Sequence, residues 1–75
     1  MLQFKDKRLV KFGEHVRNVR EGLGLTPAEV ALRSTLTQRD LLSIEEGNKS
    51  FAFTTFLELC KGLDVQPTDL LKLEF

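Results

Sequence analysis

Two helix-start patterns, eleven residues apart, restrict the fold of this chain more than any other feature of its sequence. Residues 26–29 read TPAE, in which the threonine can cap free amides, the proline suits the first helical position and the glutamate completes a capping box. Residues 37–40 read TQRD and repeat the pattern with aspartate in place of glutamate. Ser34 and Thr35 offer turn chemistry between the two patterns. The sequence therefore predicts two short helices joined by a tight polar turn.

Three further helices are predicted from apolar spacing and from glycine or proline punctuation. The periodicity over residues 9–22 predicts an amphipathic helix that ends at Gly22 and Gly24. The apolar spacing over residues 53–62 predicts another amphipathic helix, which ends at Gly62. The sequence QPTD at residues 66–69 is typical of a helix start and predicts a short last helix. The residues expected on buried helix faces are Phe12, Val16, Val19, Leu23, Val30, Ala31, Leu41, Ile44, Phe53, Phe56, Leu57, Cys60 and Leu63, and the last helix carries Leu70 and Leu71. The predicted fold class is all-α, with five short helices in one domain.

Composition excludes several classes of protein. At 75 residues, with 41% hydrophobic and 29% charged residues, the chain has the composition of one globular domain. A single cysteine excludes a disulfide framework and a cysteine-cluster zinc site. No apolar run is long enough for a transmembrane helix, and the charged start of the chain holds no apolar signal core. We expect a cytoplasmic protein that does not enter a membrane.

Few residues are suited to catalysis or to metal binding. His15 is the only histidine and lies at the edge of an apolar helix face, whereas Cys60 lies on the apolar stripe of residues 53–62. The glycines are isolated and build no loop that could cradle a phosphate. We expect no catalytic residues, no metal site and no cofactor. A nucleophilic pair of Cys60 and His15 is the remaining enzymatic alternative.

Charge is unevenly divided along the chain, although the formal net charge is zero. Residues 1–39 hold eight basic and four acidic residues, a net charge of +4. Residues 40–75 hold three basic and seven acidic residues, a net charge of −4. One face of a small domain can therefore be basic. The alternative is that the two halves differ without functional consequence.

The start of the helix at residue 37 has the chemistry of a surface that reads DNA bases. In a helix-turn-helix motif the second helix enters the major groove with its first residues against base edges. Gln38 suits adenine, Arg39 suits guanine, and Asp40 can accept a hydrogen bond from cytosine. The alternative is a solvated helix start, for which polar residues serve equally well.

A family resemblance rests on four parts of the sequence. They are VRNVREGLGLT at residues 16–26, Ala31, LTQRDLLSIEEGN at residues 36–48 and FLELCKGLDVQPTDLL at residues 56–71. Together they make residues 12–71 similar to the lambda-repressor/Cro-like helix-turn-helix DNA-binding domains, also called the XRE family. The resemblance implies a five-helix fold and a double-stranded DNA operator as partner.

The resemblance also implies roles for individual residues. Arg20 and Glu45 match an ion pair that orients the base-reading helix. The residues that match base-reading positions are Thr37, Gln38, Arg39, Asp40, Leu42 and Ser43. The residues that match the phosphate-contacting loop are Asn48, Lys49 and Ser50. The first hypothesis is therefore a sequence-specific transcription regulator, either a dimeric repressor or a small autoregulatory controller or antitoxin, since family members with the last two roles have this size.

Four residues depart from the family pattern, and three of them, Pro27, Glu46 and Asp40, favour a second hypothesis together with the zero net charge. Pro27 stands where a phosphate-binding glutamine is usual and offers no N–H. Glu46 and Asp40 place acids near the expected DNA surface, unless the Asp40 carboxylate is used to cap Thr37 or Gln38. Leu42 is apolar and suits either a thymine methyl group or a buried contact with a partner. The alternative function is a protein-interaction module on the same fold, with weakened or lost DNA binding.

Residues 1–11 lie outside the resemblance and are predicted to form a basic arm, with residues 12–75 as the DNA-binding domain. The arm could follow the DNA backbone, or it could be a frayed terminus, or its apolar residues could pack on a neighbour. We also predict a homodimer, because one such helix reads only a few base pairs. The expected interface is the last helix, the C-terminal tail with Phe75, and Phe51. The alternative is that these phenylalanines close the core of the monomer.

Overall fold

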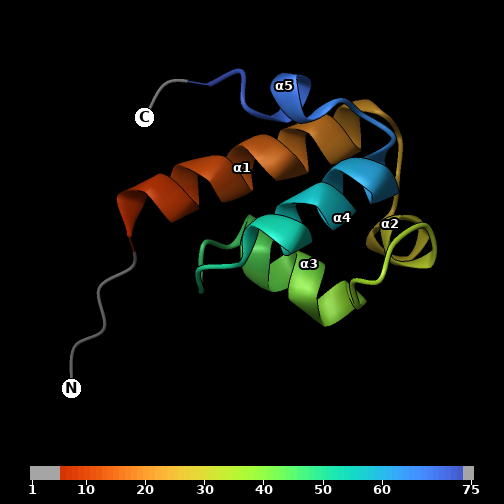
Figure 1. The fold of residues 1–75 in the computed structure, drawn as a ribbon, viewed down its shortest axis with the longest axis horizontal. Helices are drawn as coiled ribbons and strands as arrows, with labels where there is room; N and C mark the ends of the chain where they lie inside the picture. Colours follow the sequence, from red (N-terminus) through yellow and green to blue (C-terminus); the bar gives the residue numbers. More distant parts are fainter. Residues whose placement is uncertain (1–5, 74–75) are drawn as a thin grey trace.

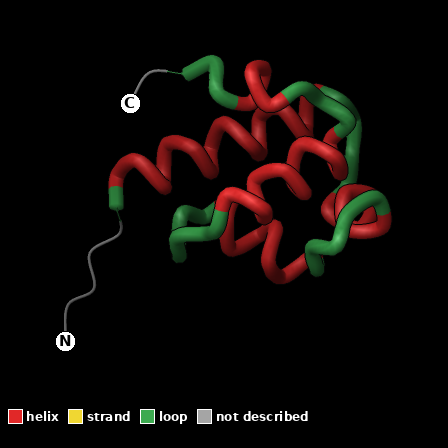
Figure 2. Tube along the Cα trace, in the orientation of Figure 1, coloured by secondary structure: helices red, strands yellow, loops and turns green. Residues whose placement is uncertain are grey.

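The computed structural model describes residues 6–73 and contains five helices in this range. They are α1 (Lys7–Gly22), α2 (Pro27–Leu32), α3 (Gln38–Glu45), α4 (Phe53–Leu63) and α5 (Pro67–Leu70) (Figures 1 and 2). The described residues contain no strand. The predicted all-α class with five short helices is therefore confirmed.

The helices pack as a small bundle around α4. Helix α1 contacts α3, and α2 packs against α3 at one side of the molecule (Figure 1). Helix α4 packs against α2, and α5 folds back onto α1 and α4. The turn between α2 and α3 thus lies at the edge of the bundle, where the start of α3 projects.

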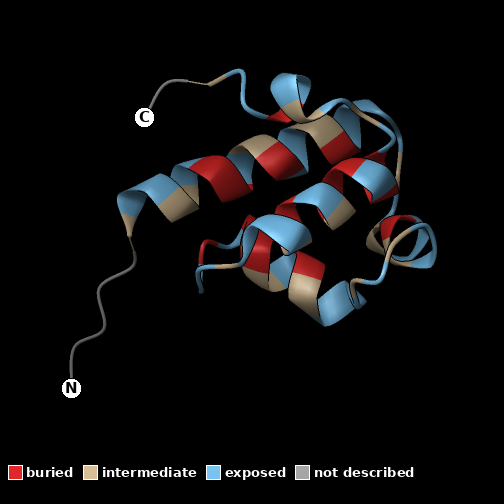
Figure 3. Ribbon diagram, viewed as in Figure 1, coloured by how far each residue is buried: buried red, intermediate tan, exposed pale blue. Residues whose placement is uncertain are grey.

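All five helices contribute to one apolar core (Figure 3). Its buried residues are Phe12, Val16, Val30, Leu41, Ile44, Phe56, Leu59, Cys60, Leu63 and Leu70. Phe51 was expected at a dimer interface, but it is half-buried and its ring centre lies 5.4 Å from that of Phe12. Phe51 therefore helps to close the monomer core. Phe75 lies outside the described residues.

The first helix begins earlier than its apolar periodicity predicts. Asp6 is the N-cap, and its carboxylate accepts hydrogen bonds from the backbone N–H and the guanidinium of Arg8 at 2.7–3.0 Å. These contacts lower the pKa of Asp6 to about 2. Residues 7–11 of the predicted basic arm are therefore part of α1, which extends the predicted helix by two residues. Residues 1–5 lie outside the described part of the chain.

The end of α4 also differs from the prediction. The helix continues through Gly62 to Leu63, and Asp64 takes the left-handed conformation, with φ at 57°. Gly62 is buried, and a Cβ there would lie 2.8 Å from a methyl carbon of Val30. This glycine is needed for the close approach of α4 to α2 rather than for a helix cap.

Candidate nucleic-acid interface

The trailing end of α3 (residues 44–47) is tied to α1 by a buried ion pair. The Arg20 guanidinium donates from Nε to Glu45 Oε2 at 2.7 Å and from an Nη atom to Glu45 Oε1 at 3.0 Å. Another Nη atom of Arg20 donates to the carbonyl oxygen of Leu25 at 3.0 Å. The Glu45 side chain is fully buried, and Arg17 Nε approaches it at 3.5 Å from the surface. This is the predicted pair, and it holds α3 against α1 through strong, charge-assisted hydrogen bonds.

Close backbone contact reinforces the same end of α3. Gly13 of α1 lies against the carbonyl groups of Ile44 and Glu45, where a Cβ atom would overlap with them. Gly47 follows α3 with φ at 71°, and a Cβ there would lie 2.6 Å from the Cα of Val10. The N–H groups of Gly47 and Asn48 donate back to Ile44 and Ser43, which ends the helix in a Schellman motif.

The leading end of α3 (residues 37–40) is organised locally. Thr37 Oγ1 accepts a hydrogen bond from the Asp40 N–H at 3.0 Å, and an Asp40 carboxylate oxygen accepts from the Thr37 N–H at 3.4 Å. Gln38 and Arg39, the first two residues of the helix, are exposed. The capping box thus supports the backbone while leaving these two side chains available.

The Asp40 carboxylate caps the backbone of Thr37, which is one of the two caps that the sequence allows for it. Besides Thr37, it contacts Lys49 Nζ at 3.4 Å. The hydrogen bonds to Thr37 and then the contact with Lys49 hold the pKa of Asp40 below its ordinary value. At neutral pH the aspartate is therefore ionised, with part of its charge offset by Lys49.

The other residues expected to read bases lie along the next turn of α3. Leu42 is 37% exposed, and Ser43 is half-buried. Pro27 occupies the first position of α2, and its backbone has no N–H to donate. The arrangement therefore gathers Thr37, Gln38, Arg39 and Leu42 on an accessible part of one short helix.

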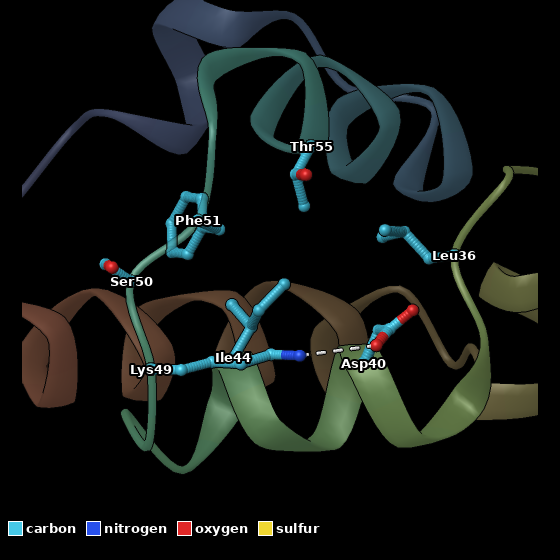
Figure 4. Close-up of a pocket in the computed structure, with 7 residues that line it drawn as sticks. All are labelled: Leu36, Asp40, Ile44, Lys49, Ser50, Phe51 and Thr55. Carbon is cyan, nitrogen blue, oxygen red and sulfur yellow. Dashed lines mark hydrogen bonds and ion pairs between the residues drawn. The ribbon is translucent and has the colours of Figure 1, made fainter.

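The residues expected to contact phosphate follow α3 directly. Asn48, Lys49 and Ser50 are all exposed, and the Asn48 amide donates to a Glu46 carboxylate oxygen at 2.7 Å. Together with Leu36, Asp40, Ile44, Phe51 and Thr55, two of these residues line a shallow pocket beside α3 (Figure 4). The Lys49–Asp40 contact runs along the α3 wall of that pocket. The 48–50 loop is thus linked to the leading end of α3.

One contributor to this site could not be identified from the sequence. The Glu58 carboxylate of α4 accepts a hydrogen bond at 2.9 Å from the N–H of Thr35, in the turn between α2 and α3. No local pattern marks Glu58, because 23 residues separate it from Thr35.

The prediction that Phe53 and Leu57 of α4 are buried is wrong. They are exposed at 70% and 41% on one face of the helix.

The enzymatic alternative gains no support from the geometry. Cys60 is buried, and burial raises the pKa of its thiol, so the reactive thiolate is disfavoured. His15 Nε2 is buried and makes no hydrogen bond within residues 6–73. The same range contains no cluster of three or more potential metal ligands. None of its helices has both the length and the apolar character needed to cross a bilayer.

Comparison with known proteins relates the chain to gene regulators. No family description and no curated protein matches it. Among solved structures, the restriction-modification controller protein C.AhdI from Aeromonas hydrophila has 30% sequence identity and a TM-score of 0.82, covering 88% of this chain and 100% of that chain.

Two further solved structures have the same fold. A mutant of the restriction-modification controller protein C.Esp1396I has 20% identity and a TM-score of 0.83, covering 92% of this chain and 87% of that one. The clp gene regulator ClgR from C. glutamicum has 26% identity and a TM-score of 0.75, covering 83% of this chain and 80% of that one. A chain that matches C.AhdI over that protein's whole length, on a fold with a tightly turned pair of capped helices, belongs to the lambda-repressor/Cro-like, or XRE, family of helix-turn-helix proteins.

Proposed function

We propose that this chain is a DNA-binding transcription regulator that reads an operator with the leading end of α3. The observation that carries the proposal is the exposure of Gln38 and Arg39 on a helix that a buried ion pair holds against α1. Glutamine and arginine make bidentate hydrogen bonds to adenine and guanine in the major groove. A fixed helix axis allows these two side chains to select bases.

The 48–50 loop supplies the proposed phosphate contacts. Asn48 and Lys49 are exposed directly beside the end of α3. When DNA binds, Lys49 exchanges its exposed contact with Asp40 for a phosphate oxygen. Such exposed ion pairs contribute little to stability, so the exchange costs little.

Selection from random duplex oligonucleotides, followed by sequencing, tests the proposal. We expect enrichment of a two-fold symmetric sequence with half-sites about one helical turn apart. Failure to enrich any sequence at low salt would contradict the regulator function. It would favour the interaction module, for which the specific observation is the pair of acids, Asp40 and Glu46, that flank the 48–50 loop.

We further propose that the regulator acts as a homodimer through α4. Phe53 and Leu57 lie one turn apart and form an exposed apolar strip, and Leu71, which follows α5, is also exposed. An apolar strip of this kind on a small domain is typical of an association surface. A second copy is the partner that a two-fold symmetric operator requires.

Sedimentation analysis of Phe53→Ser tests the dimer. We expect the variant to dissociate at concentrations at which the unmodified chain stays dimeric. The matched control is Leu32→Ser, which removes a leucine that is 87% exposed at the end of α2 and should leave association unchanged. A wild-type monomer at tens of micromolar would contradict the dimer while leaving the DNA-reading surface intact.

The narrower role that we propose is that of a small autoregulatory controller. Similarity to the restriction-modification controller protein C.AhdI over its full length supports this role over that of an antitoxin. Transcription of the chain's own gene, measured with increasing amounts of the protein, is the corresponding test. A change in transcription that depends on the selected operator is expected, and an unchanged rate would contradict autoregulation.

A further inference from the structure

The turn between α2 and α3 is held by a side chain from outside the helix-turn-helix motif. Glu58, in the second turn of α4, accepts a hydrogen bond from the backbone N–H of Thr35 at 2.9 Å. This hydrogen bond lowers the pKa of the Glu58 carboxyl below its ordinary value of 4.5. The carboxylate is therefore ionised at neutral pH and accepts a charge-assisted hydrogen bond.

The two neighbours of Thr35, Ser34 and Leu36, are held in the turn by hydrogen bonds of the Ser34 hydroxyl. Ser34 Oγ donates to the carbonyl oxygen of Val30 at 2.9 Å and accepts from the Leu36 N–H at 3.2 Å. A Cβ atom on Gly62 would lie 3.3 Å from the Ser34 Cβ, so α4 passes directly beneath the turn. The Ser34 hydroxyl holds Leu36 and is itself held by Val30, whereas the N–H of Thr35 between them is held by Glu58 of α4.

This attachment matters because the two ends of α3 are restrained unequally. The trailing end has the buried Arg20–Glu45 pair and close backbone packing. The leading end and the turn before it are held by single hydrogen bonds and one exposed ion pair instead. Ser34 joins the turn to Val30 of α2, Glu58 of α4 holds Thr35, two residues before the N-cap, and Lys49 joins Asp40 to the 48–50 loop.

We propose that Glu58 is a positioning residue for base recognition: by holding Thr35, it fixes the direction in which Thr37, Gln38 and Arg39 leave the turn. The proposal rests on the DNA-reading function proposed above. Glu58 itself need not touch DNA. Its carboxylate carries a charge of the same sign as phosphate, so a direct phosphate contact would be unfavourable.

Two neutral variants separate the hydrogen bond from the charge. Glu58→Gln removes the charge but keeps an amide oxygen that can accept from Thr35. Glu58→Ala removes both. A purely electrostatic role predicts that the two variants behave alike, whereas a positioning role predicts that glutamine retains function.

The first measurement needs no DNA. Backbone ¹⁵N relaxation of residues 35–40 should show increased motion in Glu58→Ala and near wild-type values in Glu58→Gln. In the wild type, the Thr35 amide shift should follow a titration below pH 4.5, because the contact is present above that pH and is lost as Glu58 is protonated. Unchanged relaxation in Glu58→Ala would overturn the proposal, whether or not the chain binds DNA.

The second measurement uses the operator obtained by selection. We expect Glu58→Ala to weaken operator binding about three- to tenfold, the range for one net hydrogen bond, with little change for scrambled DNA. Glu58→Gln should stay within about twofold of the wild type. Equal losses in the two variants, or none in Glu58→Ala, would overturn the positioning role. A wild-type chain that selects no operator would contradict the proposed function instead, and the relaxation data would still decide whether Glu58 fixes the turn.

Discussion

The two ends of α3 are built in opposite ways. At the trailing end, a fully buried carboxylate accepts two hydrogen bonds from one arginine of α1, and glycine allows the backbones to touch. At the leading end, a capping box supplies the hydrogen bonds from within the helix, and Gln38 and Arg39 remain exposed. The trailing end therefore fixes the position of the helix, while the leading end offers side chains to a partner.

This difference separates stability from recognition within one helix of eight residues. A buried charge left without its partner is strongly destabilising. An exposed polar side chain can be replaced at little cost to folding. Substitutions at the trailing end should therefore change the free energy of unfolding first, and substitutions at the leading end should change DNA selectivity first.

The largest expected effect is that of Arg20→Ala. Removing the partner of buried Glu45 should lower the free energy of unfolding by about 3–5 kcal/mol. A chain of this length has a total stability of roughly 4–11 kcal/mol, so urea denaturation would show a marginal fold. Arg17→Ala is the matched control, because its half-exposed guanidinium should contribute no more than about 1 kcal/mol. Equal losses in the two variants would contradict the special role of the buried pair.

Gly13→Ala tests the backbone contact at the same end. The added methyl group would overlap with the carbonyl groups of Ile44 and Glu45, and we expect a loss of about 1–3 kcal/mol. Gly22→Ala, in the same helix, meets open space and should leave stability unchanged or raise it by up to about 1 kcal/mol. Thermal melting of the two variants makes the comparison. An unchanged melting temperature in Gly13→Ala would show that α1 and α3 do not pack closely enough at residue 13 to exclude a methyl group.

Thr37→Ala tests whether the cap at the leading end of α3 affects DNA preference as well as stability. Loss of the capping hydrogen bond should cost about 1 kcal/mol of stability. Thr26→Ala removes the equivalent cap from α2 and should cost a similar amount, about 1 kcal/mol. Only Thr37→Ala should also reduce the preference for the selected operator over scrambled DNA. If both variants reduce that preference equally, Thr37 acts through helix stability alone.

The smallest expected effect is that of Lys49→Ala. Removal of the Lys49 ammonium group should weaken binding to all DNA sequences alike and reduce the slope of log affinity against log salt by about one unit. Stability should barely change, because the contact between Lys49 and Asp40 is exposed. Lys61→Ala, at an exposed lysine on α4, should leave the salt slope unchanged. A sequence-dependent loss in Lys49→Ala would show that this lysine reads a base.

The elements that the sequence predicts well are those encoded over three or four residues. Both capping boxes join residues three apart, so the starts of α2 and α3 were predictable from their own sequence. The family resemblance added the Arg20–Glu45 pair, whose partners are 25 residues apart. The start of α1 was missed because Asp6 and Arg8, which together cap it, resemble part of a charged tail.

Contacts between helices that follow no repeating pattern were not predictable. Gly62 was expected to end α4, but its lack of a side chain serves the approach to Val30, and Asp64 ends the helix instead. Phe51 and Phe53 have the same side chain, yet one packs against Phe12 and the other is exposed. Phe51 lies in the loop before α4 and Phe53 at the first position of the helix, and the path of that loop past Phe12 does not follow from helical spacing.

Base reading by α3 is tested by Arg39→Ala, through the ratio of the affinities for the selected operator and for scrambled DNA. If Arg39 reads a base, this ratio falls about 5- to 150-fold, the equivalent of one lost bidentate contact with a base, while the urea midpoint stays within error of the wild type. A ratio that stays unchanged, with both affinities falling together, would exclude base reading by this residue. Arg39 would then act only as a positive charge, and the exposed tip of α3 would not read DNA sequence.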